Sequence, residues 1–160
     1  MPHEPTSPTR PGKIAGIDFG VVRVGIAVCD PERKIAFPLE IYRRRSEKLD
    51  MEYFQKLAQT ERLVHFVFGL PLHCNGDFSD KARQAVEFAN KVADATGLTI
   101  DFQDERFTSV IAEDYLRQAN IKAKDRKKKL DQIAAQIILQ TYIDRGCVGA
   151  REFEALDDEE

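Results

Sequence analysis

Cysteine is scarce in this chain of 160 residues, and the three that occur, Cys29, Cys74 and Cys147, are widely spaced. No two of them form a CxxC pair, so the sequence does not indicate a thiolate zinc site. An odd set of cysteines without a secretion signal favours reduced thiols over a disulfide framework. We therefore expect a cytoplasmic protein rather than a small disulfide-stabilised one.

Long hydrophobic runs are also lacking, and none reaches the length that spans a bilayer. The first twelve residues contain four prolines and no apolar stretch of the kind found in a secretion signal. We expect residues 1–12 to be a disordered lead-in, 13–146 to form one folded domain, and 147–160 to be an acidic tail. No internal repeat is visible, and we expect no contact with a membrane.

Charge is unevenly distributed along the chain, which carries a formal net charge of −3. The last ten residues contribute −5, so residues 1–150 carry +2. Two basic clusters stand out, Arg43–Arg45 and the segment KAKDRKKK at 122–129. Such clusters can neutralise nucleic-acid phosphates, although most charge runs are simply solvated surfaces. Charge alone leaves both interpretations open.

Hydrophobic patterning predicts the element order β-β-β-α-β-α-β-α-α. The predicted strands lie at 14–19, 23–29, 34–44, 63–71 and 98–105, and the predicted helices at 46–62, 81–96, 109–119 and 129–145. Pro38 should confine the third strand to an edge or a bulge. The first three strands can pair antiparallel, whereas strands separated by helices need right-handed crossovers and parallel pairing. We predict an α/β fold with a five-stranded mixed sheet flanked by helices.

Three acidic residues are notable for their predicted positions. Asp18 ends the first strand, Glu105 follows the fifth, and Asp131 lies in the first turn of the last helix. Parallel strands end at a common edge of the sheet, and a helix crossing that edge could add Asp131. Converging carboxylates repel one another unless a cation neutralises them, and oxygen ligands suit Mg²⁺ or Mn²⁺. Such metal sites hydrolyse phosphodiesters.

Each acid also has an ordinary structural explanation when it is taken singly. Asp18 could begin an Asx turn, and Asp131 could be an acid favoured by the helix dipole. Glu105 could form a surface ion pair with the adjacent Arg106. Only their shared position at one predicted sheet edge favours a metal site. His65, inside a predicted strand, is better explained as a packed core residue.

Four segments resemble the motif blocks of one bacterial family. GIDFGVVRVGIAVCD, FVFGLPLHCNGDFSDKA, DERFTSVIAEDYL and LDQIAAQIILQTYID resemble, in order, the motifs of the YqgF (RuvX) family. The resemblance covers about residues 13–145 and implies a ribonuclease H-like fold related to the RuvC Holliday junction resolvases. It also implies a metal-dependent endonuclease that processes the 5′ end of pre-16S rRNA in the cytoplasm during ribosome biogenesis. The family's motif acids match Asp18, Glu105 and Asp131.

One position departs from the pattern of the RuvC relatives, which carry a pair of aspartates on the last helix. One turn before Asp131, this chain has Lys127 or Lys128. The departure weakens a strict two-metal assignment, and the resolvase function with it. A single tightly held metal, or a second one bound mainly by substrate phosphate, would fit the sequence.

Five basic residues are candidates for phosphate contacts: Arg23, Arg106, Lys127, Lys128 and Lys129. The expected partner is a nucleic acid, either structured RNA or branched DNA, bound by a monomer or a homodimer. Two alternatives to a ribosomal RNA nuclease remain, a Holliday junction resolvase and a non-catalytic nucleic-acid-binding module. An ATPase of the sugar-kinase type also has a strand-Asp-x-Gly motif, but it needs two such domains.

Overall fold

The computed structural model describes residues 11–72, 79–105 and 108–147, apart from some side chains on the last two helices. Within these ranges the chain forms five strands and four helices in the predicted order. They are β1 (Lys13–Asp18), β2 (Arg23–Cys29), β3 (Ala36–Arg43), α1 (Glu47–Thr60), β4 (Leu63–Leu70), α2 (Asp80–Thr96), β5 (Thr99–Asp104), α3 (Thr108–Gln118) and α4 (Ala123–Asp144). The predicted lead-in and acidic tail lie almost wholly outside the described residues, so both stay predictions.

The five strands form one mixed sheet in the order β3-β2-β1-β4-β5. β1 pairs antiparallel with β2, and β2 with β3, whereas β1–β4 and β4–β5 are parallel. Pro38 lies on the edge strand, where the register shifts between Ile26 and Ala27 of β2. Proline lacks the N–H that a central strand would need, so both the edge position and the bulge follow from its chemistry. The predicted sheet is confirmed.

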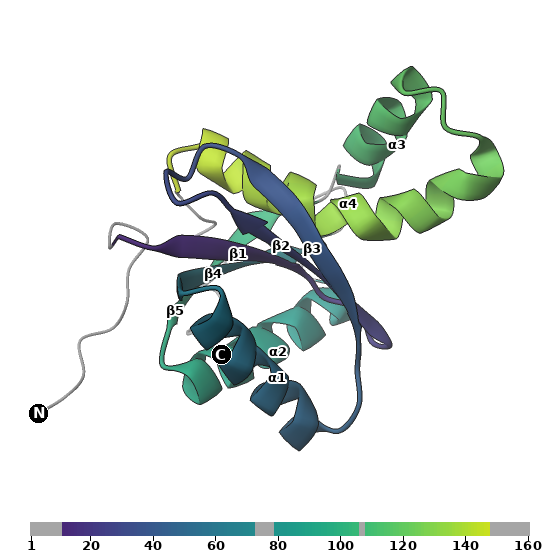
Figure 1. Cartoon of the computed structure of the whole chain (residues 1–160). Helices are drawn as coiled ribbons and strands as arrows, with labels where there is room; N and C mark the ends of the chain where they lie inside the picture. The colour runs from purple at the N-terminus through teal and green to yellow at the C-terminus, as the bar shows by residue number, and fades with distance from the viewer. Residues whose placement is uncertain (1–10, 73–78, 106–107, 148–160) are drawn as a thin grey trace, which may run out of the picture.

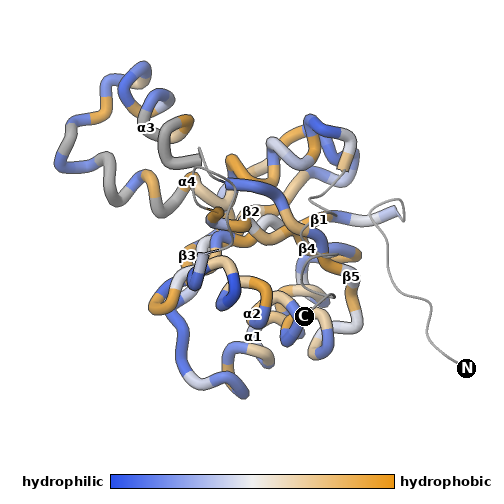
Figure 2. Tube along the Cα trace, turned by 180° about the vertical axis from the view of Figure 1, so that it is seen from behind, coloured by the Kyte–Doolittle hydropathy of each residue, from blue (hydrophilic) through white to orange (hydrophobic). Residues whose placement is uncertain are grey.

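Helices cover the sheet on both faces, with α1 and α2 on one side and α4 on the other (Figure 1). All eight residues of β4 are buried, as expected for a strand covered on both faces. One hydrophobic core lies beneath α1 and α2 and the other beneath α4. Figure 2 shows long hydrophobic stretches along the central strands and hydrophilic ones mainly in loops and on outer helical turns.

The helix ends that position the loops are capped as their sequences predict. Ser46 accepts a hydrogen bond from the Leu49 N–H at 3.2 Å, and Gly97 ends α2 with a φ of 72°. The apolar residues of α1 are only partly buried. Leu49 is 38% exposed, whereas Asp50, the residue next to it, is fully buried.

Helix α4 begins at Ala123, six residues before its predicted start. The basic segment at 122–129 therefore forms the first turns of the helix and does not precede it. Lysine, arginine and alanine have good helix propensity, and an apolar stripe is not required where a helix extends beyond the sheet. α3 packs on α4 and lies away from the sheet (Figure 1). None of the helices described here is long and apolar enough to cross a membrane.

Candidate active site

Asp18 lies at the carboxyl end of β1, in the middle of the sheet. It is half-buried and pairs with Gly25 across the β1–β2 ladder. The residue before it, Ile17, lies level with Phe68 of the parallel strand β4. A pocket of about 220 Å³ opens beside Asp18. Its lining consists of Asp18, Phe19, Gly20, Val22, Arg23, Gly25, Ile41 and Lys81.

Glu105 follows β5 directly and lies at the same edge. Its N–H donates to the carbonyl oxygen of Leu70 at 3.2 Å, which ties the end of β5 to the end of β4. Its side chain crosses Gly69, where an added Cβ would lie only 2.7 Å from Oε2 of Glu105. The same Cβ would lie 2.4 Å from Cδ1 of Ile138 on α4. The missing side chain at Gly69 therefore makes room for the carboxylate between β4 and α4.

The pKa of Glu105 shows that its carboxyl group lies close to the charge of Asp18. Burial, first, and the negative charge of Asp18, second, raise the pKa of Glu105 to about 8, against an ordinary value of 4.5. Lys81 acts in the opposite direction, and Asp104 raises the pKa slightly further. At neutral pH and without a counter-cation, Glu105 is therefore mostly protonated. A half-buried pair of carboxyl groups, one of which keeps its proton at neutral pH, is a donor set that suits a hard divalent cation.

The direction of α4 determines where Asp131 lies on the backbone. Tyr142 contacts His65, which is level with Ile14 near the start of β1. Further along β1, an added Cβ on Gly16 would lie 2.9 Å from the carbonyl oxygen of Ala135. The helix thus runs antiparallel to β1, and the turn before Ala135 extends toward the edge that carries Asp18.

The side chain of Asp131 lies outside the described residues, so its convergence with Asp18 and Glu105 stays a prediction. Among the side chains that are described, no group of three or more His, Cys, Asp or Glu residues could hold a metal ion. The charge of Asp18 acts on the Glu105 carboxyl group, so the structure brings together two of the three predicted acids. His65 is a packed core residue, as predicted. It is hydrogen-bonded to Thr99 at 2.7 Å and to Tyr142 at 3.0 Å.

The predicted phosphate contacts divide into three groups. Arg23 is exposed and lines the Asp18 pocket. Lys129 is exposed on α4, and its role stays a prediction. Arg106 and the side chains of Lys127 and Lys128 lie outside the described residues.

Sequence reasoning missed Lys81, the second residue of α2, which lines the pocket beside Asp18. The start of α2 is held near the end of β4, because the Ser79 hydroxyl donates to the Pro71 carbonyl oxygen at 2.5 Å. The available signal was the turn-rich segment between a buried strand and a helix. A cation in the first turn of that helix must lie near the carboxyl edge of the sheet.

Comparison with known proteins agrees with this geometry. A family model described as "RuvX: Holliday junction resolvase" matches residues 12–145. A protein of Rhodopirellula baltica is 40% identical over 133 residues, which cover 83% of this chain and 77% of that one. A protein of Syntrophomonas wolfei is 41% identical over 137 residues, covering 86% and 97%. Both relatives carry the name "Putative pre-16S rRNA nuclease".

Solved structures of resolvases share the fold. RuvC of T. thermophilus in complex with a Holliday junction substrate has a TM-score of 0.51 at 15% identity, covering 85% of this chain and 97% of that one. The fowlpox virus Holliday junction resolvase also has a TM-score of 0.51, at 13% identity, covering 83% and 99%. These likenesses confirm the ribonuclease H-like fold. The family model and the two relatives show that the chain belongs to the RuvX family of nucleases, which are hydrolases of phosphodiester bonds.

Proposed function

We propose that this protein is a metal-dependent endonuclease that cleaves structured RNA and processes the 5′ end of pre-16S rRNA in the cytoplasm. One observation carries the proposal. Asp18 and Glu105 share the carboxyl edge of the sheet, and burial together with the charge of Asp18 raises the pKa of Glu105 to about 8. Holding two carboxyl groups this close costs electrostatic free energy unless a cation neutralises them, so the site is suited to bind a cation. The names of the relatives supply the class of substrate.

Asp18 and Glu105 would hold the divalent cation, Mg²⁺ or Mn²⁺, with Asp131 as the third ligand implied by the family resemblance. When bound, such a cation supplies Lewis-acid activation of water and charge stabilisation at the leaving oxygen. Glu105 must release its proton before it can act as a ligand. Gly69 leaves the space in which its carboxylate lies.

Arg23 and Lys81 supply the positive charge that a phosphate backbone requires. Both line the pocket of about 220 Å³ beside Asp18, on the side of the turn between β1 and β2. An RNA phosphate entering this pocket would meet two cations next to a carboxylate. The arrangement favours binding of the backbone rather than of a particular base.

The direct test is cleavage of a pre-16S rRNA fragment, with an unrelated structured RNA and a four-way DNA junction for comparison, in Mg²⁺ or Mn²⁺. Asp18→Asn and Glu105→Gln should each abolish cleavage and leave RNA binding in place. Asp94→Asn, on the exposed side of α2, is the matched control and should cleave at the wild-type rate. Wild-type rates in both site variants would refute the assignment of the acids.

A resolvase activity is the second candidate, because the solved structures that share the fold are Holliday junction resolvases. Cleavage of the four-way junction with all RNAs left intact would favour it. A non-catalytic binding module is the third alternative. It predicts that Lys81 and Arg23 matter for binding and that neither acid matters for any reaction.

A further inference from the structure

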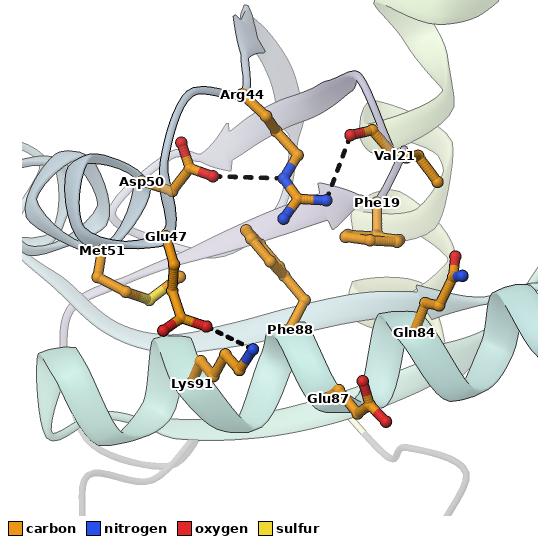
Figure 3. A pocket seen from close by; sticks show the side chains of 10 residues that line it. All are labelled: Phe19, Val21, Arg44, Glu47, Asp50, Met51, Gln84, Glu87, Phe88 and Lys91. Atoms are coloured by element: carbon orange, nitrogen blue, oxygen red, sulfur yellow. Dashed lines mark hydrogen bonds and ion pairs between the residues drawn. The ribbon is translucent and has the colours of Figure 1, made fainter.

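A second pocket, of about 190 Å³, lies between α1, α2 and the turn that follows Asp18 (Figure 3). Arg44 extends into it, with its guanidinium carbon 5.2 Å from the ring centre of Phe19 and 5.0 Å from that of Phe88. The ion pair between Lys91 and Glu47 lies on the same pocket. Sequence reasoning counted Arg44 only as part of a basic cluster, but its side chain packs inward on two aromatic rings.

Arg44 contacts nearly the whole turn between β1 and β2. Its guanidinium donates to the carbonyl oxygen of Val21 at 3.3 Å, and its backbone N–H donates to that of Val22 at 2.9 Å. It also lies over the ring of Phe19, the residue next to Asp18. The turn itself is tightly packed, because an added Cβ on Gly20 would lie 2.3 Å from the Arg23 carbonyl oxygen.

Arg44 also contacts Asp50 on α1, which is fully buried. Its carboxylate accepts hydrogen bonds from the Tyr42 hydroxyl at 2.7 Å, the Arg45 N–H at 2.8 Å and Nε of Arg44 at 3.3 Å. Asp50 is therefore held in place by three donors and in turn orients the guanidinium of Arg44. A chain of contacts runs from α1, through Asp50 and Arg44, to the turn beside the candidate metal ligand.

A buried ion pair is weak evidence for stability, because desolvation offsets most of the attraction. Well-packed apolar residues would fill the same volume at no electrostatic cost. An arginine at this position contributes a planar group with fixed directions for its contacts. A planar guanidinium can accept the orientation set by Asp50, donate to a carbonyl oxygen and stack on two rings at once. Lysine keeps the charge but offers neither the planar fork nor the stacking.

We propose that Arg44 is a positioning residue of the site: held by Asp50, it fixes residues 19–22 and thereby fixes the carboxylate of Asp18. The inference rests on the proposed nuclease function for its consequence in catalysis. The expected effect on the turn is independent of the proposed nuclease function. Because catalysis depends on placing reacting groups to within about 1 Å, a loosened turn lowers the rate of the chemical step more than it lowers RNA affinity.

The test compares Arg44→Lys with wild-type protein in two independent measurements. Exchange of the Arg44 backbone amide hydrogen, which is donated to the Val22 carbonyl oxygen, reports on the contact that holds the turn. Single-turnover cleavage and a separate RNA-binding titration distinguish the cleavage rate from RNA affinity. We expect exchange of this amide hydrogen to be accelerated at least about tenfold. The cleavage rate should fall about 10- to 100-fold, with the Kd for RNA within about twofold of wild type. Lys91→Met is the matched control, since Lys91 lines the same pocket and forms its ion pair with Glu47 on α1.

Chemical rescue provides a second route, which also serves if Arg44→Lys does not fold. Arg44→Ala opens a space continuous with the pocket, and added ethylguanidinium should restore part of the cleavage rate and slow exchange of the backbone amide at residue 44. Unchanged exchange in Arg44→Lys would overturn the inference, as would a loosened turn with wild-type cleavage. If wild-type protein cleaves no RNA, the proposed function has failed, while the exchange data still decide whether Arg44 fixes the turn.

Discussion

Replacing Glu105 by glutamine should make the protein more stable at neutral pH, although it destroys the proposed site. The amide keeps the shape of the protonated carboxyl group but never has to ionise. In the wild-type protein, burial and the charge of Asp18 raise the pKa of Glu105 to about 8, whereas the ordinary value is 4.5. The folded state therefore holds a proton that the unfolded state has already lost between these two values.

The sign and size of the effect follow from linkage. Below pH 4.5 the carboxyl group is protonated in both states, and the variant gains nothing. As the pH rises toward 8, the unfolded state ionises first, so the wild-type protein loses stability relative to Glu105→Gln. The difference in the free energy of unfolding should reach about 3 kcal/mol at pH 7 and about 5 kcal/mol above pH 8.

Urea unfolding of both proteins at pH 5, 6, 7 and 8, with and without Mg²⁺, measures this difference. Added Mg²⁺ should stabilise the wild-type protein and reduce the gap, because a ligand that binds only the folded state stabilises it. It should leave Glu105→Gln almost unaffected. A gap that does not change with pH, or a variant that is less stable at pH 8, would show that Glu105 is not held in a protonated state by its surroundings.

Three further predictions test other parts of the structure. Gly69→Ala should lower the free energy of unfolding by about 1–3 kcal/mol in urea denaturation, because the new methyl group collides with Glu105 and Ile138. Burial lowers the pKa of His65 to about 4, so wild-type stability should fall relative to His65→Gln as the pH drops from about 6.5 to 4, by up to about 3 kcal/mol. Lys81→Gln should reduce the salt dependence of RNA binding, measured as the slope of log K against log salt, by about 0.7 to 1. An unchanged slope would show that Lys81 does not contact an RNA phosphate.

The sheet was predictable from the sequence because its signals are local. An uninterrupted apolar run marked β4, and Pro38 excluded a central position for β3. Asp18 and Glu105 could be assigned to one edge because parallel strands end together. Their positions relative to the strands required no knowledge of long-range contacts.

The parts that sequence reasoning missed depend on contacts between distant segments. Nothing in the local pattern shows that Asp50 is buried, since its neighbour Leu49 fits the apolar stripe better and yet is exposed. The arginine that pairs with it, Arg44, was indistinguishable from two neighbouring arginines. The early start of α4 was missed because its lysine-rich turns do not pack on the sheet and so carry no apolar periodicity.

The position of α4 has a consequence for how the chain is made. It follows all five strands along the chain, and it covers the hydrophobic core on its face of the sheet, which includes Ile14 and Val67. A chain emerging from the ribosome leaves that face uncovered until α4 has been synthesised. The acids at residues 18 and 105 can be present well before the helix that closes the fold. The fold is therefore closed only after α4 has left the ribosome, and one apolar face of the sheet stays uncovered until then.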